Sequence, residues 1–176
     1  MTFERLNIPE VLLFKPNRFI DERGFFSETY NKKLFDSAIG ENINFVQDNF
    51  SESKKGVLRG IHYQEMPYSQ AKLVRVSLGA VFDVAVDLRK ESPNYLNWVG
   101  VELSDKNGHQ LWIPEGFGHA FLTLSDVAHF SYKTSSFYNK ESERTVLWDD
   151  PRIGINWPNI SNIKISKKDL NGVNID

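Results

Sequence analysis

Residues 70–88 read QAKLVRVSLGAVFDVAVDL, two apolar runs on either side of Gly79. Each run is rich in β-branched and aromatic residues and has the length of a strand. Because a glycine between such runs favours a tight turn, we expect 70–78 and 80–88 to pair as a hairpin. This hairpin would place Lys72 near the centre of a sheet, and it indicates a β protein.

Similar short runs recur along the chain, separated by Gly, Pro, Asn, Asp or Ser. This spacing is typical of an all-β sandwich or barrel. Apolar residues recur at helical spacing after Asn31, which predicts one short helix over 31–39. The expected strands are 24–30, 43–51, 57–63, 70–78, 80–88, 96–103, 109–113, 119–124 and 127–136.

The composition is that of one globular domain. The chain has 176 residues, 40% of them hydrophobic, which is enough for one substantial core but leaves no room for a second full domain. Its 21 basic and 23 acidic residues give a net charge of −2, so nothing in the charge balance indicates nucleic acid or an anionic membrane as a partner. We therefore expect a single domain over 1–176.

The absence of cysteine excludes disulfides, thiolate metal sites and thiol nucleophiles, and it fits a reducing compartment. The first residues contain no basic segment followed by an apolar run, and no apolar stretch reaches the roughly 18 residues of a membrane span. We expect a soluble, unprocessed, cytoplasmic protein.

Lys72 is the unusual residue of the first apolar run. Period-two alternation places it on the same face as Val74 and Val76, so its ammonium points the same way as two core-type valines. A solvated edge position explains many strand lysines, whereas a buried lysine needs a partner. Asp83 and Asp87 alternate with apolar neighbours in the second run, and we interpret them as outward-facing carboxylates without a role.

The histidines give little sign of a metal site. A metal-binding cupin needs convergent imidazole and carboxylate ligands, with two histidines one residue apart. The four histidines, His62, His109, His119 and His129, contain no such pair. We therefore expect no metal, and each histidine taken alone is interpreted as a hydrogen-bonded imidazole.

Further polar side chains lie on or near the predicted strands. Guanidinium groups match phosphate oxygens in bidentate geometry, and amide side chains can recognise the polar edge of a base. Alternation points Gln47 and Asn49 to one face, but it puts Arg59 and His62 on opposite faces. A bulge at the intervening glycine would let both face one site, so we predict irregular backbone within 59–62. The polar set is Arg23, Glu28, Gln47, Asn49, Arg59 and Glu143.

Seven segments, in the same order along the chain, resemble the dTDP-4-dehydrorhamnose 3,5-epimerase family. They are Arg23–Glu28 (RGFFSE), Gly56–Gln64 (GVLRGIHYQ), Gln70–Val74 (QAKLV), Phe82–Arg89 (FDVAVDLR), Trp112–Phe121 (WIPEGFGHAF), Tyr132–Lys133 (YK) and Trp148–Pro158. Each motif is modest by itself, but together they cover nearly the whole chain. The resemblance implies an all-β fold, a cupin-type jelly roll (a β-sandwich) with a few short helices. It also implies a homodimer and no metal or other cofactor.

The same resemblance implies epimerisation of a dTDP-linked 4-keto-6-deoxyhexose at C3 and C5, on the route to dTDP-L-rhamnose. By position, the family's general base is His62, its carboxylate partner is Asp169 and its acid is Tyr132. Lys72 matches the lysine beside the sugar ketone. Tyr138 matches the aromatic ring that stacks on thymine. The other ligand-binding positions are Arg23, Glu28, Gln47, Asn49, Arg59, His119, Glu143 and Lys168.

This residue set suits proton transfer at carbon. A ketone at C4 acidifies the hydrogens on C3 and C5, so a base on one face of the sugar and an acid on the other can invert each centre through an enolate. An imidazole suits the base, and a buried Asp169 would orient His62 and stabilise its protonated form. Lys72 would stabilise the enolate oxygen, and Tyr132 would return a proton from the opposite face. Such a reaction requires no redox cofactor.

Three alternatives stay open on the sequence alone. A relative that inverts only C3 or only C5, or that takes another nucleotide 4-keto sugar, would share these motifs, because the outcome depends on the depth of the sugar and the placement of Tyr132. A non-catalytic jelly roll that binds sugars or nucleotides would have no need of His62, Lys72 and Tyr132 together. A metal-dependent cupin oxygenase would need the paired histidines that the chain lacks.

Overall fold

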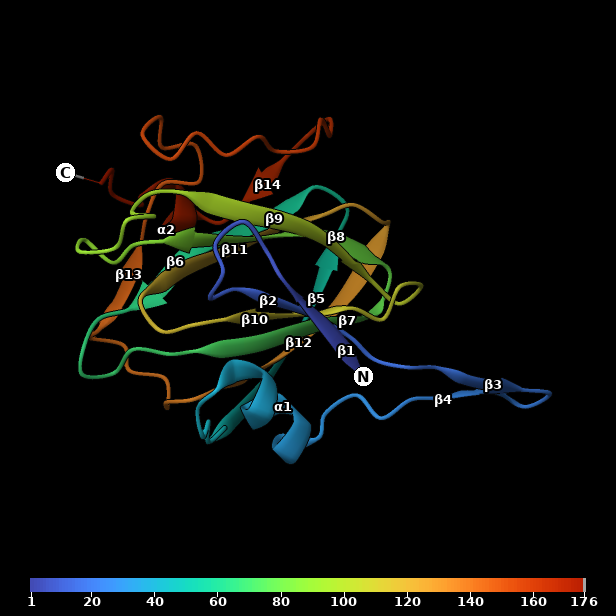
Figure 1. Cartoon of the computed structure of the whole chain (residues 1–176). Coiled ribbons are helices and arrows are strands. Elements are labelled where there is room, and N and C mark those ends of the chain that lie inside the picture. The colour runs from blue at the N-terminus through green and yellow to red at the C-terminus, as the bar shows by residue number, and fades with distance from the viewer. Residues whose placement is uncertain (176) are drawn as a thin grey trace.

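The computed structural model describes residues 1–175, which fold mainly into β-strands (Figure 1). The strands are β1 (Thr2–Arg5), β2 (Leu12–Lys15), β3 (Phe19–Asp21), β4 (Gly24–Phe26), β5 (Gln47–Lys54), β6 (Val57–Gln64), β7 (Lys72–Leu78), β8 (Ala80–Asp87), β9 (Trp98–Ser104), β10 (Gln110–Ile113), β11 (Phe117–Thr123), β12 (Val127–Thr134), β13 (Glu143–Thr145) and β14 (Lys164–Ile165). The helices are α1 (Lys32–Ile39) and α2 (Lys167–Leu170).

Two sheets face each other and confirm the expected all-β sandwich (Figure 1). Sheet I has the strand order β1-β2-β10-β7-β12-β5, and sheet II has the order β13-β6-β11-β8-β9, with β14 beside β6. Neighbouring strands are antiparallel except for β14, which runs parallel to β6. Because consecutive strands alternate between the sheets over much of the chain, residues distant in sequence meet in the space between them.

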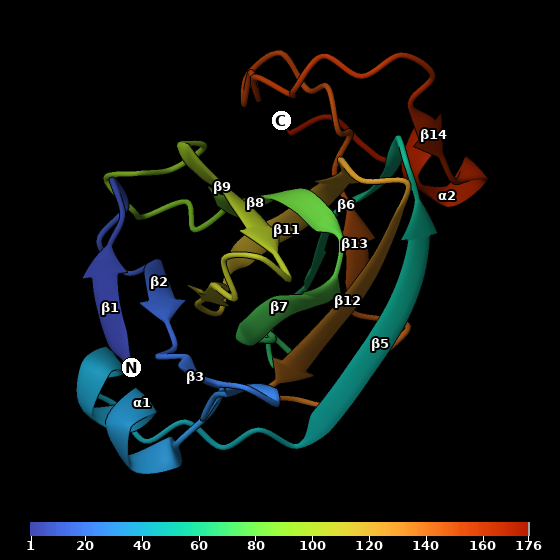
Figure 2. The same cartoon turned by 90° about the vertical axis from the view of Figure 1, so that its right-hand side faces the viewer.

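Three apolar clusters hold these layers together. The cluster between the sheets includes Val74 and Phe121. Helix α1 packs on the outer face of sheet I (Figure 2). There the rings of Phe35 and Trp112 meet edge to face at 5.2 Å between centroids. The chain from Val146 onward covers the outer face of sheet II. Sheet II is therefore buried on both sides. Its strands do not show the alternation of apolar and polar residues that a sheet with one solvated face would show.

The expected hairpin between 70–78 and 80–88 is wrong. β7 lies in sheet I between β10 and β12, whereas β8 lies in sheet II between β11 and β9. Gly79, with a φ of +77°, carries the chain from one sheet to the other, and its N–H donates to the Asp105 carboxylate. A corner between two sheets needs the same glycine as a hairpin does, so the local sequence does not distinguish them. Lys72 does lie on a central strand, as expected.

The expectation that Asp83 and Asp87 face outward is also wrong, because both are fully buried. They have the same parity on β8 as Val81, which belongs to the cluster between the sheets. Val84, of the opposite parity, packs under the C-terminal segment instead. Asp87 is paired with Arg89 at 2.6 Å. The apolar neighbours of these two aspartates suggested that the carboxylates face outward. Those neighbours are themselves buried, under the C-terminal segment.

The other sequence-based expectations hold best in the middle of the chain. β6 to β12 fall within a few residues of the predicted strands, but β1, β2, β3, β13, β14 and α2 were not expected. Helix α1 is confirmed: the Asn31 side chain accepts a hydrogen bond from the Leu34 N–H, and Gly40 ends the helix with a φ of +84°. No helix within residues 1–175 combines the length and the apolar character needed to cross a membrane.

β3 and β4 form a two-stranded arm, residues 19–26, that projects away from the sandwich (Figure 1). Its apolar side chains are largely uncovered: Phe19, Ile20, Phe25 and Phe26 are between 59% and 80% exposed. Clustered exposed aromatic side chains mark interaction surfaces more often than isolated ones do. The arm is therefore a surface that a second chain can cover.

Gly79→Ala should destabilise the protein more than Gly40→Ala. Their φ values of +77° and +84° are similar, so the backbone cost of a side chain is similar at both. A Cβ at Gly79 would lie 2.1 Å from the Val127 carbonyl oxygen and 2.3 Å from the Ser125 Oγ, whereas a Cβ at Gly40 would meet nothing within 4 Å. We expect Gly79→Ala to lose about 2 kcal/mol more in urea unfolding. Equal losses would contradict a crowded corner.

Candidate active site

A cavity of about 300 Å³ lies between the two sheets. Strands β5, β7 and β12 of sheet I and β6, β11 and β13 of sheet II contribute to its wall. Many of the side chains that the sequence singled out meet here, although they are spread over more than 90 positions, from Asn49 to Glu143. The polar residues on the wall are Asn49, Ser51, Arg59, His62, Tyr63, Gln64, Gln70, Lys72, His119, Tyr132, Tyr138 and Glu143, with Phe50, Phe121 and Phe130 beside them.

A buried carboxylate holds the imidazole of His62. The Nε2 atom of His62 lies 2.6 Å from Oδ1 of Asp169, which is only 3% exposed. Ser166 caps helix α2 by accepting from the Asp169 N–H, and this fixes the carboxylate behind the ring. Burial acts to raise the pKa of Asp169, but its contacts with His62, Gly60 and Ser166 outweigh burial and the pKa is lowered. Asp169 therefore stays ionised and orients the ring of His62.

The backbone of β6 is irregular between Arg59 and His62, as predicted. In the pairing with β11, His62 lies opposite His119, but Arg59 lies opposite Phe121, so three steps on β6 match two on β11. Gly60 occupies the bulge with a φ of +114°. The bulge allows the guanidinium and the imidazole to reach the same cavity.

Lys72 enters the cavity from sheet I. It is only 7% exposed, and its Nζ lies 3.5 Å from the His62 carbonyl oxygen. Burial lowers the pKa of Lys72 to about 8, while the charges of Asp83 and Glu143 act in the opposite direction. The ammonium is thus poorly solvated and lies beside His62, where it can stabilise a new negative charge.

Tyr132 faces the cavity from β12, the strand next to β7 in sheet I. Burial raises the pKa of its phenol, the charge of Glu143 raises it further, and Arg59 opposes both. The phenol is therefore protonated at neutral pH and can donate. Because His62 belongs to sheet II, the imidazole and the phenol approach the cavity from opposite sheets.

His119 and Asp83 form a second buried imidazole–carboxylate pair. The Nε2 of His119 lies 3.0 Å from Oδ2 of Asp83, and the ring stacks on Phe130 at 5.8 Å between centroids. Burial raises the pKa of Asp83 and lowers that of His119. The attraction between the two groups acts in the opposite direction on both pKa values. Asp83 was not expected here. Its parity with Val81, a core-type residue, is the signal that would have placed it inside.

The remaining polar residues form a connected chain at the cavity mouth. The Tyr138 hydroxyl donates to Glu143 at 3.0 Å, and Glu143 pairs with Lys168 at 2.5 Å. The Tyr138 N–H donates to the Gln47 side chain, which in turn donates to Asn49 at 2.9 Å. Burial acts to raise the pKa of Glu143, but Lys168 and Tyr138 lower it overall. The Tyr138 ring itself is 54% exposed and free to stack.

Arg23 and Glu28 do not line the cavity of their own chain. Arg23 lies at the turn of the arm, where its guanidinium binds Asp21 at 2.6 Å and its side chain is 84% exposed. Glu28 follows the arm and accepts a hydrogen bond from the Asn31 side chain at 3.3 Å. The site residues expected from the sequence are thus assembled by one chain, except for these two.

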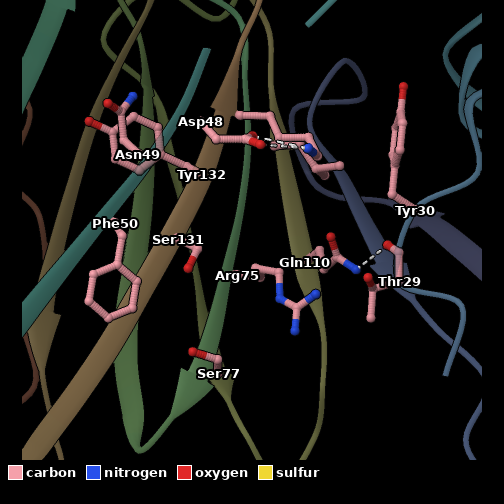
Figure 3. Close-up of a pocket in the computed structure, with 12 residues that line it drawn as sticks. Thr29, Tyr30, Asp48, Asn49, Phe50, Arg75, Ser77, Gln110, Ser131 and Tyr132 are labelled. Carbon is pink, nitrogen blue, oxygen red and sulfur yellow. Dashed lines mark hydrogen bonds and ion pairs between the residues drawn. The ribbon is translucent and has the colours of Figure 1, made fainter. Parts of the chain in front are cut away.

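A second hollow, of about 430 Å³, lies over the strands of sheet I (Figure 3). Arg75 lines it beside Gln110, whose amide donates to the Thr29 carbonyl oxygen. Asn49 and Tyr132 belong to the walls of both hollows. No histidine lines this one, so the acid–base groups gather in the first cavity. Within residues 1–175, no cluster of three or more His, Cys, Asp or Glu side chains could hold a metal ion.

The sequence profile of the dTDP-4-dehydrorhamnose 3,5-epimerase family matches residues 5–176. The chain belongs to this family. The epimerase of that name from Shigella flexneri is 57% identical to it, over 98% of this chain and 94% of the relative. The resemblance that the motifs indicated is therefore confirmed over nearly the whole length.

Solved structures of related proteins support the same family. The dTDP-6-deoxy-D-glucose-3,5-epimerase of Legionella pneumophila, in complex with dTDP-4-keto-L-rhamnose, superposes with a TM-score of 0.95 at 45% identity and covers 98% of this chain and 92% of its own. A dTDP-4-dehydrorhamnose 3-epimerase of Streptomyces niveus is 40% identical over 90% of this chain and 76% of the relative. Of these relatives, those named for two inversions are more similar than the one named for a single inversion.

Asp169→Asn should lower stability in a pH-dependent way. The pKa of Asp169 is lowered in the folded state, so its stabilising effect is complete above the unfolded value of about 3.9 and is lost as the pH falls through the folded value. We expect the difference in the free energy of unfolding from wild type to be largest near pH 7 and to shrink toward pH 3 in urea titrations. Leu170→Ala, in the same helix, has no titrating group and is the control. A difference that stays constant with pH would contradict this assignment.

Proposed function

We propose that residues 1–176 form one cytoplasmic epimerase domain that inverts C3 and C5 of dTDP-4-keto-6-deoxy-D-glucose in dTDP-L-rhamnose biosynthesis. The observation that carries the proposal is the arrangement of three groups around one cavity. His62, backed by Asp169, comes from sheet II, while Tyr132 and the buried Lys72 come from sheet I. A sugar ring between the sheets would have a base on one face and an acid on the other.

The first step breaks a C–H bond next to the ketone. His62 takes the proton, and the electron pair moves onto the C4 carbonyl oxygen as an enolate. The ionised Asp169, at 2.6 Å, stabilises the imidazolium that results. Lys72 stabilises the enolate oxygen, an effect worth about 3 kcal/mol when such a donor is lost elsewhere. Its burial strengthens the interaction, because little water competes for the charge.

The second step returns a proton to the same carbon from the other face. The Tyr132 phenol is protonated at neutral pH and lies on the sheet opposite His62, so it suits this donation. Solvent then removes the proton from His62 and restores that of Tyr132. No electrons are gained or lost overall, so inversion needs no oxidant or reductant. Repetition at the second carbon completes the double inversion.

The cavity mouth suits the nucleotide. The exposed ring of Tyr138 can stack on thymine. Gln47 accepts a hydrogen bond from the Tyr138 N–H and donates one to Asn49, so both amides lie near this ring and can recognise the edge of the base. Arg59 and Lys168 add positive charge beside the cavity for the diphosphate. This local cluster provides anion binding in a chain whose net charge is −2.

We also propose a homodimer, in which the arm of one chain completes the site of the other. The arm exposes Phe19 and Phe26, which are 62% and 69% uncovered and need a partner surface. Arg23 and Glu28 match ligand-binding positions of the family but lie on or beside this arm, away from their own cavity. A second copy can bring both residues to a substrate without any change in the sandwich.

Incubation with dTDP-4-keto-6-deoxy-D-glucose, a 4-keto reductase and NADPH in heavy water tests the activity. We expect reductase turnover that depends on this protein, and deuterium at both C3 and C5 by NMR. His62→Ala should lose the exchange and at least about 100-fold in rate. Tyr132→Phe should still exchange hydrogen at carbon but invert poorly, because only the donor from the opposite face is missing.

Lys90→Ala, on the exposed surface, is the matched control for these variants and should behave as wild type. Deuterium at one carbon only would instead identify an epimerase for a single centre. Binding of dTDP without any exchange would identify a non-catalytic nucleotide-binding protein and overturn the proposal.

Mixing two defective variants tests the exchanged arm. Arg23→Ala should weaken substrate binding, and His62→Ala should abolish chemistry. If the arm serves the other chain, a mixed dimer contains one intact site, so joint refolding of equal amounts should restore about a quarter of the wild-type activity. No restoration, or an Arg23→Ala protein as active as wild type at low substrate, would contradict the exchange.

A further inference from the structure

We propose that Asp83 is a positioning residue for the reaction: its carboxylate orients His119 and compensates the buried ammonium of Lys72. This inference rests on the proposed epimerase function. It concerns a residue that touches the substrate cavity only through its neighbours, since Asp83 itself is fully buried and does not line the cavity wall.

The surroundings of Asp83 are unusual for a carboxylate. It shares the inner face of β8 with Val81 and Ala85, both fully buried in the apolar cluster between the sheets. Its Oδ2 contacts His119 at 3.0 Å, but its Oδ1 has no hydrogen-bond partner among the described residues. A half-satisfied carboxylate in a core costs several kcal/mol unless another charge compensates it. Packing alone gives no reason for an aspartate here.

Lys72 is a second source of positive charge for Asp83, after His119. Like Asp83 it points into the space between the sheets, on the same face of β7 as Val74 and Val76. Of the negative charges near Lys72, that of Asp83 has the largest effect in raising its pKa against burial, followed by that of Glu143. A buried ammonium and a buried carboxylate each reduce the cost of the other.

Other titrating groups face Lys72 from each strand packed around the cavity. Glu143 on β13 is itself held by Lys168 at the mouth. His119 lies on β11 and His62 on β6, while Tyr132 lies on the neighbouring strand β12. Two of these are imidazoles whose protonation would repel the ammonium, and Glu143 has a partner of its own. Asp83 is therefore the negative charge best able to keep Lys72 protonated.

The same carboxylate fixes the ring of His119. With the proton on Nε2 donated to Asp83, the Nδ1 atom is left as an acceptor, and no described residue hydrogen-bonds to it. The ring stacks on Phe130 and lines the cavity opposite His62 on β6. Burial lowers the pKa of His119, which favours this neutral form. Asp83 thus presents an oriented acceptor to the sugar.

Asp87 provides a matched comparison on the same strand. It is equally buried, but both of its oxygens are occupied, by Arg89 and by Ser92. Its charge is thus neutralised locally, and it does not line the cavity. Replacement of Asp87 should affect stability, whereas replacement of Asp83 should affect the charge of Lys72.

The pH dependence of kcat in the coupled assay distinguishes the two. Asp83→Asn keeps an oxygen that can accept from His119 but removes the charge, so Lys72 should lose its proton at lower pH. We expect the alkaline limb of kcat to move down by about one pH unit, a tenfold loss of rate on that limb. Asp83→Glu restores the charge and should return the limb toward wild type. Asp87→Asn should leave the limb in place while lowering the unfolding midpoint.

Thermal unfolding at pH 7 provides the second measurement. Because Asp83 and Lys72 reduce the cost of burying each other, Asp83→Asn should unfold at a lower temperature than wild type, and Asp83→Glu should recover part of the loss. A limb that does not move in Asp83→Asn, or moves equally in Asp87→Asn, would overturn the inference, as would an Asp83→Asn protein that unfolds at the wild-type temperature or above. Wild-type protein without epimerase activity would overturn the proposed function instead.

Discussion

The hydrogen bond between His62 and Asp169 joins a central strand of sheet II to the last helix of the described chain, and the proposed acid–base site depends on it. β14 runs beside β6, and Ser166 caps α2 directly after it, so the carboxylate is fixed to the strand that carries the imidazole. The same C-terminal segment buries the outer face of sheet II. One segment therefore completes both the core and the dyad.

The space between the sheets serves two purposes that conflict. Val74, Phe117 and their neighbours fill it as an apolar core, while Lys72, Asp83 and His119 occupy the same space with groups that burial penalises. The interior tolerates these polar groups because each lies beside a side chain of opposite charge or a hydrogen-bond partner. The proposed electrostatic stabilisation of an enolate needs a site with little water, and the sandwich interior provides one.

Much of this could be predicted from the sequence, for identifiable physical reasons. Strand periodicity gave the β-sandwich and placed Lys72 inside, and the requirement that Arg59 and His62 share a site predicted the bulge between them. Local pattern could not distinguish a corner at Gly79 from a hairpin, because the turn chemistry is the same. Asp83 was misplaced because its neighbours Val84 and Val86 are also buried, under a distant segment that covers the other face of β8, so apolar side chains do not mark only the inner face.

The distance along the chain between the two members of the dyad has a consequence for biosynthesis. During translation the ribosome delivers the imidazole first, and its carboxylate follows 107 positions later. A chain that stopped before Val146 would therefore lack both the carboxylate partner of His62 and the cover of one face of sheet II.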